Sequence, residues 1–342
     1  MKHRNLLATV VLSLALSVGA AFAQDTFDIA VFFPGDLGGN PLEPPITAGV
    51  ERVRQAFPNV TVRVAEGGAA SDWETGLIAL VATQRYELII TFTDGMPQIL
   101  QTVSVLFPDQ KYVLLDSSVE GLPNVYSLIY SDEALGFVGG VFAGLLATNP
   151  DMSADVAAPK VGLLAGTPYP AMDNKIHPGY AAGAHYVDPA IEVLFAAVGD
   201  WNNPNRARDL ALNMYSRGST AIMSITGGGD SGVHRAAAET GNYAIAVNTN
   251  QNASQPGVIL GSVLKRIDNS IYSAVEAAMA GTLPYGTVET AGVEEGAISI
   301  ADDDLYRQHV PQALRDKLVA VMDGIVSGDI DLLGLLQAEL ND

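Results

Sequence analysis

The stretch from Gly166 to Ala184 (GTPYPAMDNKIHPGYAAGA) concentrates side chains that can contact a ligand. Two tyrosines, a methionine, a histidine, a lysine, an asparagine and an aspartate lie there among three prolines. The stretch follows an apolar run typical of a strand and leads into a helical pattern. A connection this long and this decorated is typical of a binding loop held by a rigid scaffold. A solvated connection without a function is the alternative, and we favour the binding loop.

A further aromatic side chain stands in a polar turn. Trp201 lies in the sequence VGDWNNPN, after a run typical of a strand. A tryptophan of the core is usually set in an apolar pattern. Trp201 is therefore either a platform for a flat ligand or a tryptophan packed within its own loop. The sequence leaves both interpretations open.

The glycine-rich stretch from Gly227 to Arg235 (GGGDSGVHR) has two interpretations. The order Gly-Asp-Ser-Gly is like the surroundings of a serine nucleophile, which would need a histidine and an acid from elsewhere in the chain. The interpretation that we favour is a helix start with Asp230 or Ser231 as the N-cap, where free N–H groups can face a ligand. We therefore expect no enzyme, and a secreted hydrolase that uses Ser231 is the alternative of another class.

Metal ligands are not clustered along the sequence. His177, His185 and His234 are isolated from one another. The acidic run Asp302–Asp304 is typical of a helix start, where the helix dipole favours negative charge. We expect neither a metal ion nor a cofactor.

The scaffold that must position these side chains is predicted to be α/β. Short apolar runs typical of buried strands alternate with helical patterns along most of the chain. Helices are predicted for ITAGVERVRQAF, for NRARDLALNMYSRG, for the apolar segment Leu135–Ala147 and for the amphipathic segment SVLKRIDNSIYSAVEAAMAG. The predicted strands are Ile29–Phe33, Val60–Val64, Leu88–Phe92, Tyr112–Leu115, Val161–Leu164, Ile191–Ala197, Ala221–Ile225 and Ala244–Val247.

The order of these elements repeats once along the chain. A strand, a Pro/Gly-rich connection and a helix with Ala48-Gly49-Val50 recur 134 residues later, where the helix contains Ala182-Gly183-Ala184. The repeat predicts two similar lobes, each with a loop at the carboxyl edge of its sheet, which is where ligands bind in open α/β sheets. The segment after Asn248 predicts further crossings between the lobes, which would form a hinge.

Composition and the first residues limit the class of protein. A chain of 342 residues that is 48% hydrophobic is long enough for about two domains. The net charge of −20 repels nucleic acid, so we expect no nucleic-acid partner. Lys2 and Arg4, the apolar run Leu6–Val18 and the site Ala21-Phe22-Ala23 predict a cleaved signal peptide over residues 1–23. Because the chain has no cysteine, we expect a periplasmic protein that is not a lipoprotein.

Several longer segments together carry a resemblance to a known family. Their order and spacing, rather than any single segment, make the chain resemble the basic membrane protein family, also called the purine nucleoside receptor family, of ABC-transporter solute-binding proteins. The resemblance covers essentially the whole chain after the signal segment. The segments are NVYSLIYSDEALGFVGGVFAGLLA, KVGLLAG, PGYAAGAHYVDPAIEV, VGDWNNPNRARDLALNMYSRG, GGGDSGVHRAAAE, VNTNQN and SVLKRIDNSI.

The resemblance implies a fold, partners and a site. It implies two Rossmann-like lobes of the type I periplasmic binding protein kind, joined by a hinge, that close on a small molecule for a cognate ABC permease in the membrane. We expect lobe 1 to comprise residues 24–128 and 252–287, and lobe 2 to comprise residues 129–251 and 288–342. The ligand-binding candidates carried over by position are Asn40, Asp116, Tyr130, Tyr169, Met172, Trp201, Asn248 and Lys265.

Two departures from the family pattern bear on the ligand. The first loop reads GGNPLEPPITAG, where the family usually has Asp-Asp-Lys-Ser-Phe-Asn after Gly-Gly, and NTNQ from Asn248 replaces Asp-x-Asp-Gln. The first of those aspartates is expected to hold ribose hydroxyls, so Asn248 argues against that mode of recognition. The segments FFPGDLGGNPLEPPITAGV and YPAMDNKIHPGYAAGA are similar to the riboflavin-binding branch, which implies riboflavin with Tyr169 and Met172 covering its ring. A purine nucleoside is the alternative ligand.

Overall fold

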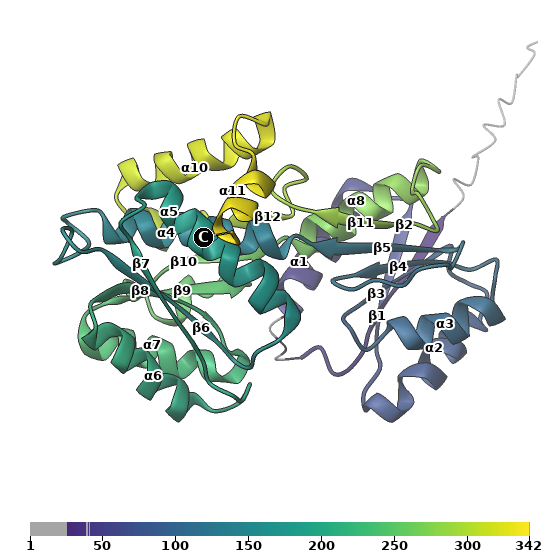
Figure 1. Ribbon diagram of the computed structural model, residues 1–342. Helices are drawn as coiled ribbons and strands as arrows, with labels where there is room; N and C mark the ends of the chain where they lie inside the picture. Colours follow the sequence, from purple (N-terminus) through teal and green to yellow (C-terminus); the bar gives the residue numbers. More distant parts are fainter. Residues whose placement is uncertain (1–25, 39, 41, 342) are drawn as a thin grey trace, which may run out of the picture.

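The computed structural model describes residues 26–38, 40 and 42–341, which form two α/β lobes lying side by side (Figure 1). The predicted signal peptide lies outside the described residues. Each lobe is built on a six-stranded sheet, drawn at the right for the first lobe and at the left for the second. The prediction of a two-lobe α/β fold is confirmed.

The first lobe has the strand order β11-β5-β4-β3-β1-β2, and all of its strand pairs are parallel. Helices α1 and α8 pack together on one face of the sheet, while α2 and α3 cover the other. The elements are β1 (Phe27–Phe33), α1 (Glu43–Ala56), β2 (Val60–Glu66), α2 (Trp73–Val81), β3 (Leu88–Phe92), α3 (Pro97–Leu106), β4 (Lys111–Leu115), β5 (Val125–Tyr130), α8 (Ile267–Met279) and β11 (Val288–Ala291).

The second lobe repeats this order as β12-β10-β9-β8-β6-β7, in which β12 is antiparallel to β10. Helices α4 and α5 cover one face and α6 and α7 the other, and the C-terminal helices pack on α4 and α5. The elements are α4 (Asp132–Ala147), β6 (Lys160–Ala165), α5 (His177–Val187), β7 (Glu192–Ala197), α6 (Pro204–Ser216), β8 (Ser219–Ile225), α7 (Asp230–Thr240), β9 (Tyr243–Asn248), β10 (Ile259–Lys265), β12 (Ile298–Ile300), α9 (Asp304–His309), α10 (Gln312–Ser327) and α11 (Leu332–Glu339).

Local sequence explains the tightest parts of this packing. Strands β3 and β8 are buried at every residue, as expected for parallel strands that are covered on both faces. Helices α4 and α5 approach closely because glycines face each other across the contact. A Cβ atom at Gly140 would overlap the carbonyl oxygen of Tyr180, and one at Gly183 would overlap that of Phe137.

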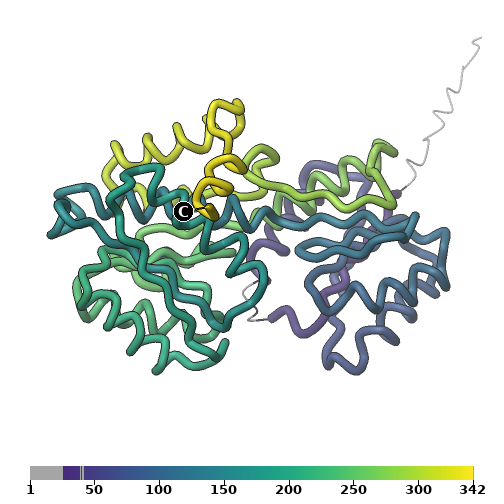
Figure 2. Tube along the Cα trace, viewed as in Figure 1, coloured from purple at the N-terminus to yellow at the C-terminus, as the bar shows by residue number. Residues whose placement is uncertain are grey.

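Within the described residues, the chain crosses between the lobes three times, from β5 to α4, from β10 to α8 and from β11 to β12. The crossings lie next to one another along the trace (Figure 2). The amide of Ser131 donates to the carbonyl oxygen of Ala291 at 2.9 Å, and the amide of Arg266 donates to that of Ala297 at 2.8 Å. The three crossings therefore form one hydrogen-bonded hinge.

The predicted strands are all present, but the segment SVLKRIDNSIYSAVEAAMAG differs from the prediction of a single helix. Its first residues, Ser262–Lys265, complete strand β10, and helix α8 begins only at Ile267. Val263 and Ile267 are four residues apart, which matches a helical face, but pairing of β10 with β9 overrides that local pattern. Strands β5 and β12 were not predicted either.

The expected lobe boundaries also need correction at two strands. Strand β10 falls in residues 252–287, which we expected in lobe 1, but it pairs with β9 in the second sheet. Strand β11 begins at Val288, where we expected lobe 2, yet it pairs with β5 in the first sheet. The sequence of a short strand does not show with which sheet it will pair. Each crossing therefore lies later in the chain than the predicted lobe boundary.

Candidate functional site

A cavity of about 870 Å³ lies between the lobes, within the size range of small-molecule sites. The second lobe supplies most of its wall, from the carboxyl ends of strands β8, β9 and β10 and from the first turn of α7. The first lobe contributes Pro44, Pro45 and Ala48 from the start of α1. The cavity thus occupies the edge of the sheets at which open α/β folds bind ligands.

One member of an aromatic pair forms part of the wall. Trp201 lines the cavity and is 39% exposed, and its ring centroid lies 5.7 Å from that of Tyr169. Trp201 rests on the backbone of Gly166, where a Cβ atom would overlap the indole. Burial raises the pKa of Tyr169 to about 12, so its hydroxyl is neutral and can donate a hydrogen bond. The predicted loop and the predicted turn therefore meet at the cavity.

A cluster of three charges joins the lobes beside the cavity. The Lys265 ammonium, at the end of β10, lies 2.9 Å from an Asp116 carboxylate oxygen after β4, and 4.0 Å from Asp132 at the start of α4. Burial acts against the charge of Lys265, but the attraction of Asp116 and Asp132 outweighs it and holds the pKa of the ammonium above its usual value. The cation is therefore already neutralised within the protein.

Two strand ends at the site have left-handed backbones. Asp116 has a φ of 59° and Asn248 a φ of 69°, and asparagine and aspartate tolerate this region better than most residues. The two residues end corresponding strands, because β4 and β9 occupy the same place in their sheets. The left-handed turn directs the chain away from the sheet at the point where the side chain meets the cavity region.

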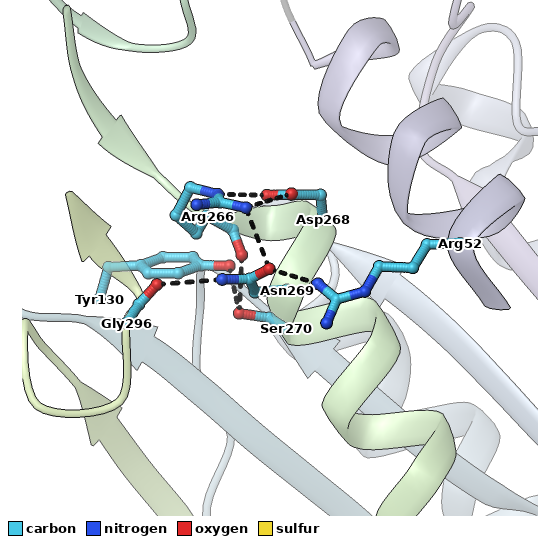
Figure 3. Close-up of polar contacts among 7 residues, drawn as sticks. All are labelled: Arg52, Tyr130, Arg266, Asp268, Asn269, Ser270 and Gly296. Carbon is cyan, nitrogen blue, oxygen red and sulfur yellow. Dashed lines mark hydrogen bonds and ion pairs between the residues drawn. The ribbon is translucent and has the colours of Figure 1, made fainter. Parts of the chain in front are cut away.

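The hinge next to the cavity is held by polar side chains (Figure 3). Arg266 donates two hydrogen bonds to Asp268, at 2.8 and 2.7 Å. The Asn269 side-chain oxygen accepts from Arg52 and Arg266, and its nitrogen donates to the carbonyl oxygen of Gly296 at 3.3 Å. Asn269 therefore links α1, the second crossing and the third.

The structure brings most of the predicted site residues together. Trp201, Asn248 and Lys265 line the cavity, while Asp116 contacts Lys265 and Tyr169 contacts Trp201. These residues are far apart in the sequence, and they lie together because each is near the carboxyl edge of a sheet.

The other three predicted residues do not line the cavity. Tyr130 is buried and donates from its hydroxyl to Ser270 at 2.9 Å, and the Lys265 ammonium lies 5.7 Å from its ring centroid, which places Tyr130 at the hinge beside Lys265. Met172 is fully buried in the core, so the expectation that it covers a ligand ring is not supported by its position. The Asn40 side-chain oxygen accepts from the amide of Leu42 at 2.9 Å, which is a turn contact.

Sequence reasoning missed part of the wall that α7 provides. Asp230 was predicted as an N-cap, but Gly229 takes that position and the Asp230 carboxylate accepts from the amide and the hydroxyl of Thr226. His234 also lines the cavity. Its signal was present in the sequence, since it follows Asp230 by one helical turn and therefore shares its face.

Within residues 26–38, 40 and 42–341, no group of three or more metal-ligating side chains is arranged to hold an ion. Nor does any helix in the same ranges have the length and apolar character that crossing a bilayer requires.

Known proteins with the same architecture define the class. A solute-binding protein of an ABC transporter system from Aeropyrum pernix K1 has a TM-score of 0.70 at 20% identity, covering 89% of this chain and 92% of that one. Another from Conexibacter woesei has a TM-score of 0.72 at 18% identity, covering 89% and 98%. The fold is therefore that of the two-lobed solute-binding proteins.

The family follows from the sequence match. Residues 27–331 match the Bmp family model, described as ABC transporter substrate-binding protein PnrA-like, and the chain belongs to this family. A relative from Lactococcus lactis, named ABC transporter nucleoside-binding protein BmpA, is 21% identical over 78% of this chain and 76% of its own length. Members of the family are solute-binding proteins and not enzymes, and they bind transported ligands rather than cofactors. The hydrolase alternative at Ser231 is thereby removed.

The comparisons also correct the expectation of a protein that is not a lipoprotein. A relative from Pyrococcus horikoshii, 24% identical over 80% of this chain and 67% of its own length, is named an uncharacterized lipoprotein. Relatives from Pyrococcus abyssi and Pyrococcus furiosus carry the same description. The expectation was drawn from the cysteine count alone, and membership of a family that contains lipoproteins overturns it.

Proposed function

We propose that this solute-binding protein captures riboflavin or a closely related flavin in the interlobe cavity and delivers it to a cognate ABC permease. The observation that carries the proposal is an amphipathic cavity wall, with Trp201, Ile225, Val247 and Leu264 beside polar side chains of α7 and of the β9–β10 connection. A flavin has the same division, with a flat ring and a flexible hydroxylated chain. Aromatic and aliphatic side chains suit the ring face.

The charges at the cavity favour an uncharged ligand. Lys265 is paired with Asp116, and Arg266 is paired with Asp268. Pro44 and Pro45 occupy the first turn of α1, which removes two backbone N–H groups that a helix start usually offers to an anion. A phosphate group would therefore meet carboxylates without a free cation among these groups.

Asn248 supports a flavin over a nucleoside. A carboxylate accepts hydrogen bonds from both hydroxyls of a cis-diol, and such charge-assisted bonds are about twice as strong as neutral ones. An amide offers one acceptor and two donors, which suits the mixed donor and acceptor edge of a flavin ring. The proposal therefore assigns the Asn248 side chain, at the cavity wall, to that edge.

A purine nucleoside is the second candidate, because a relative is named a nucleoside-binding protein. Titration calorimetry with riboflavin, flavin mononucleotide, adenosine, guanosine and inosine separates the candidates. We expect riboflavin to bind most tightly and flavin mononucleotide to bind at least tenfold more weakly. Tighter binding of any nucleoside would refute the flavin proposal, and the Asn248→Asp variant would then show whether this position contacts a diol.

A further inference from the structure

Two side chains in the lining of the interlobe cavity each carry a buried polar atom that lacks a partner. They are His234 of α7, which follows Ser231, and Gln255 of the connection between β9 and β10, which follows Ser254. The His234 Nε2 and the Gln255 side-chain oxygen are both buried, and neither has a hydrogen-bond partner among the described residues. Buried polar groups are nearly always hydrogen-bonded, so two such atoms along one cavity call for a partner from outside the chain.

The connection that carries Gln255 is held by several side-chain hydrogen bonds at residues 250–252. Asn250 and Asn252 donate from their side-chain amides to Asp303, at 2.7 and 3.1 Å. Ser262 donates to the side-chain oxygen of Asn252 at 2.8 Å and accepts from the amide of Gln251 at 3.0 Å. These bonds fix the wall between α7 and β10. The unpaired atoms are therefore a property of a rigid wall and not of a loose loop.

His234 and Gln255 are uncharged near pH 7, and Asp230 of the same lining is already hydrogen-bonded. His234 is only 5% exposed, and burial lowers its pKa to about 4, so its ring is neutral near pH 7. A neutral imidazole donates from one nitrogen and accepts at the other. Asp230, which lies one turn earlier, uses one oxygen to accept from the amide and the hydroxyl of Thr226. A hydroxyl group, which both donates and accepts, complements this set better than an anion or a cation.

We propose that His234 and Gln255 form a subsite for the hydroxylated chain of the ligand and determine specificity for that chain. The inference rests on the proposed function, in which the ring of the ligand lies against Trp201 elsewhere on the same wall. A chain hydroxyl, directly or through one water molecule, satisfies the His234 nitrogen and the Gln255 oxygen. Ligands that share the ring but lack the chain leave both atoms unpaired.

The test compares riboflavin with lumiflavin, which has the same ring and a methyl group in place of the hydroxylated chain. Calorimetry is performed on the wild type, on His234→Leu and on Gln255→Met. Each substitution should weaken riboflavin three- to tenfold, as expected for the loss of a neutral hydrogen bond, and change lumiflavin less than twofold. His177→Leu is the matched control, because His177 stacks on Phe195 outside the interlobe cavity and should change neither ligand. Equal losses for both flavins, or unchanged riboflavin binding in both variants, overturn the subsite.

A failure of the flavin proposal is distinguishable from a failure of the subsite. If the wild type binds neither flavin, the proposed function fails, and the subsite is tested with ribitol alone as the probe. Ribitol should then shift the ring NMR signals of His234 in the labelled protein and leave those of His177 unchanged. An unshifted His234 signal at saturating ribitol overturns the subsite independently of any ring. Circular dichroism and thermal unfolding verify that each variant is folded.

Discussion

The two lobes repeat one architecture but present different surfaces to the cavity, and their tryptophans show the difference most clearly. Trp73 follows β2 and Trp201 follows β7, which are corresponding edge strands. The Trp73 indole nitrogen donates to the carbonyl oxygen of Gly68 at 3.0 Å and its ring packs on the first lobe. Trp201 lines the cavity, whereas Trp73 is not among the described residues that do. Each lobe therefore has a tryptophan shortly after the corresponding edge strand, but only the tryptophan of the second lobe is among the described residues that line the cavity.

Other corresponding positions follow the same rule. Asp116 directly follows β4 and Asn248 ends β9, while Tyr130 and Lys265 end β5 and β10. Within each pair one side chain is ionised and the other is neutral, and Lys265 of the second lobe pairs with Asp116 of the first. An exactly repeated sequence would place like groups opposite each other. Because the two lobes differ at these strand ends, a cation of the second lobe can pair with a carboxylate of the first.

The largest expected effect comes from comparing Gly49 of α1 with Gly183 of α5, which occupy the same place in the repeat. Substituting each by alanine tests whether their helix contacts are equally tight. Gly183→Ala should lower the free energy of unfolding by about 3 kcal/mol, because the added methyl group overlaps the Phe137 carbonyl oxygen in the contact between α4 and α5. Gly49→Ala should cost less, about 1–2 kcal/mol, since its methyl group would lie 3.0 Å from the end of Ile271 and 3.1 Å from the Asp268 backbone, which are tight contacts but not overlaps. Urea unfolding measures both.

The control for these substitutions is Gly76→Ala in α2. Its methyl group would have Phe32 as the nearest neighbour at 3.6 Å, which is an ordinary contact. Higher helix propensity should stabilise this variant by up to about 1 kcal/mol. Similar losses at Gly49 and Gly183 would show that the two lobes are packed alike.

The second prediction contrasts the two tryptophans. Trp201→Ala should weaken ligand binding by up to about 3 kcal/mol, by analogy with the stacking of bases on aromatic side chains, and leave the fold intact. Trp73→Ala should lower stability and leave the affinity nearly unchanged. Calorimetry and thermal unfolding of both variants decide the point. Equal losses of affinity would mean that both lobes present an indole to the ligand.

The third prediction concerns His234, a buried ionisable side chain at a position where the first lobe has an apolar one. His234 in α7 stands 134 residues after Leu100, which is buried in α3. Because burial lowers the pKa of His234 from 6.5 to about 4, the unfolded chain takes up a proton before the folded protein does. Above pH 6.5 the protonation of His234 therefore has no effect on the free energy of unfolding. As the pH falls from 6.5 towards 4, protonation of His234 in the unfolded chain lowers that free energy.

The shift in the pKa of His234 corresponds to a change of at most about 3 kcal/mol in the free energy of unfolding. Because entry of water reduces the effect of burial, we expect the free energy of unfolding to fall by about 2 kcal/mol. Urea unfolding at a series of pH values measures it. His234→Leu makes the second lobe resemble the first and should remove this part of the pH dependence. A wild type and a variant with parallel pH profiles would contradict the assignment.

The smallest expected effect concerns the hinge. Asn269 is the third residue of α8, and Ala134 is the third residue of α4. Asn269→Ala removes the contacts with Arg52, Arg266 and Gly296 and should lower the free energy of unfolding by about 1 kcal/mol. Hydrogen exchange at the Arg266 amide should become faster. Unchanged exchange there would show that backbone pairing alone holds the crossings together.

The sequence by itself determined the class of fold and the lobe architecture. Buried parallel strands read as continuous apolar runs, and the recurrence of Ala48-Gly49-Val50 as Ala182-Gly183-Ala184 revealed the repeat. The resemblance to the family supplied Trp201, Asn248 and Lys265 as candidates, and all three line the cavity. The fold class and the repeat depend on local periodicity and on chain order, which a sequence displays directly.

Only the tertiary structure determined which segments pack against or pair with one another. Strand β10 looked helical until its pairing with β9 fixed it, and Met172 looked like a ligand contact until packing placed it in the core. The unpaired atoms of His234 and Gln255 are likewise invisible in a sequence, because a missing partner is a property of three-dimensional surroundings. Burial, pairing and charge neutralisation join residues more than a hundred positions apart, and no local pattern encodes such contacts.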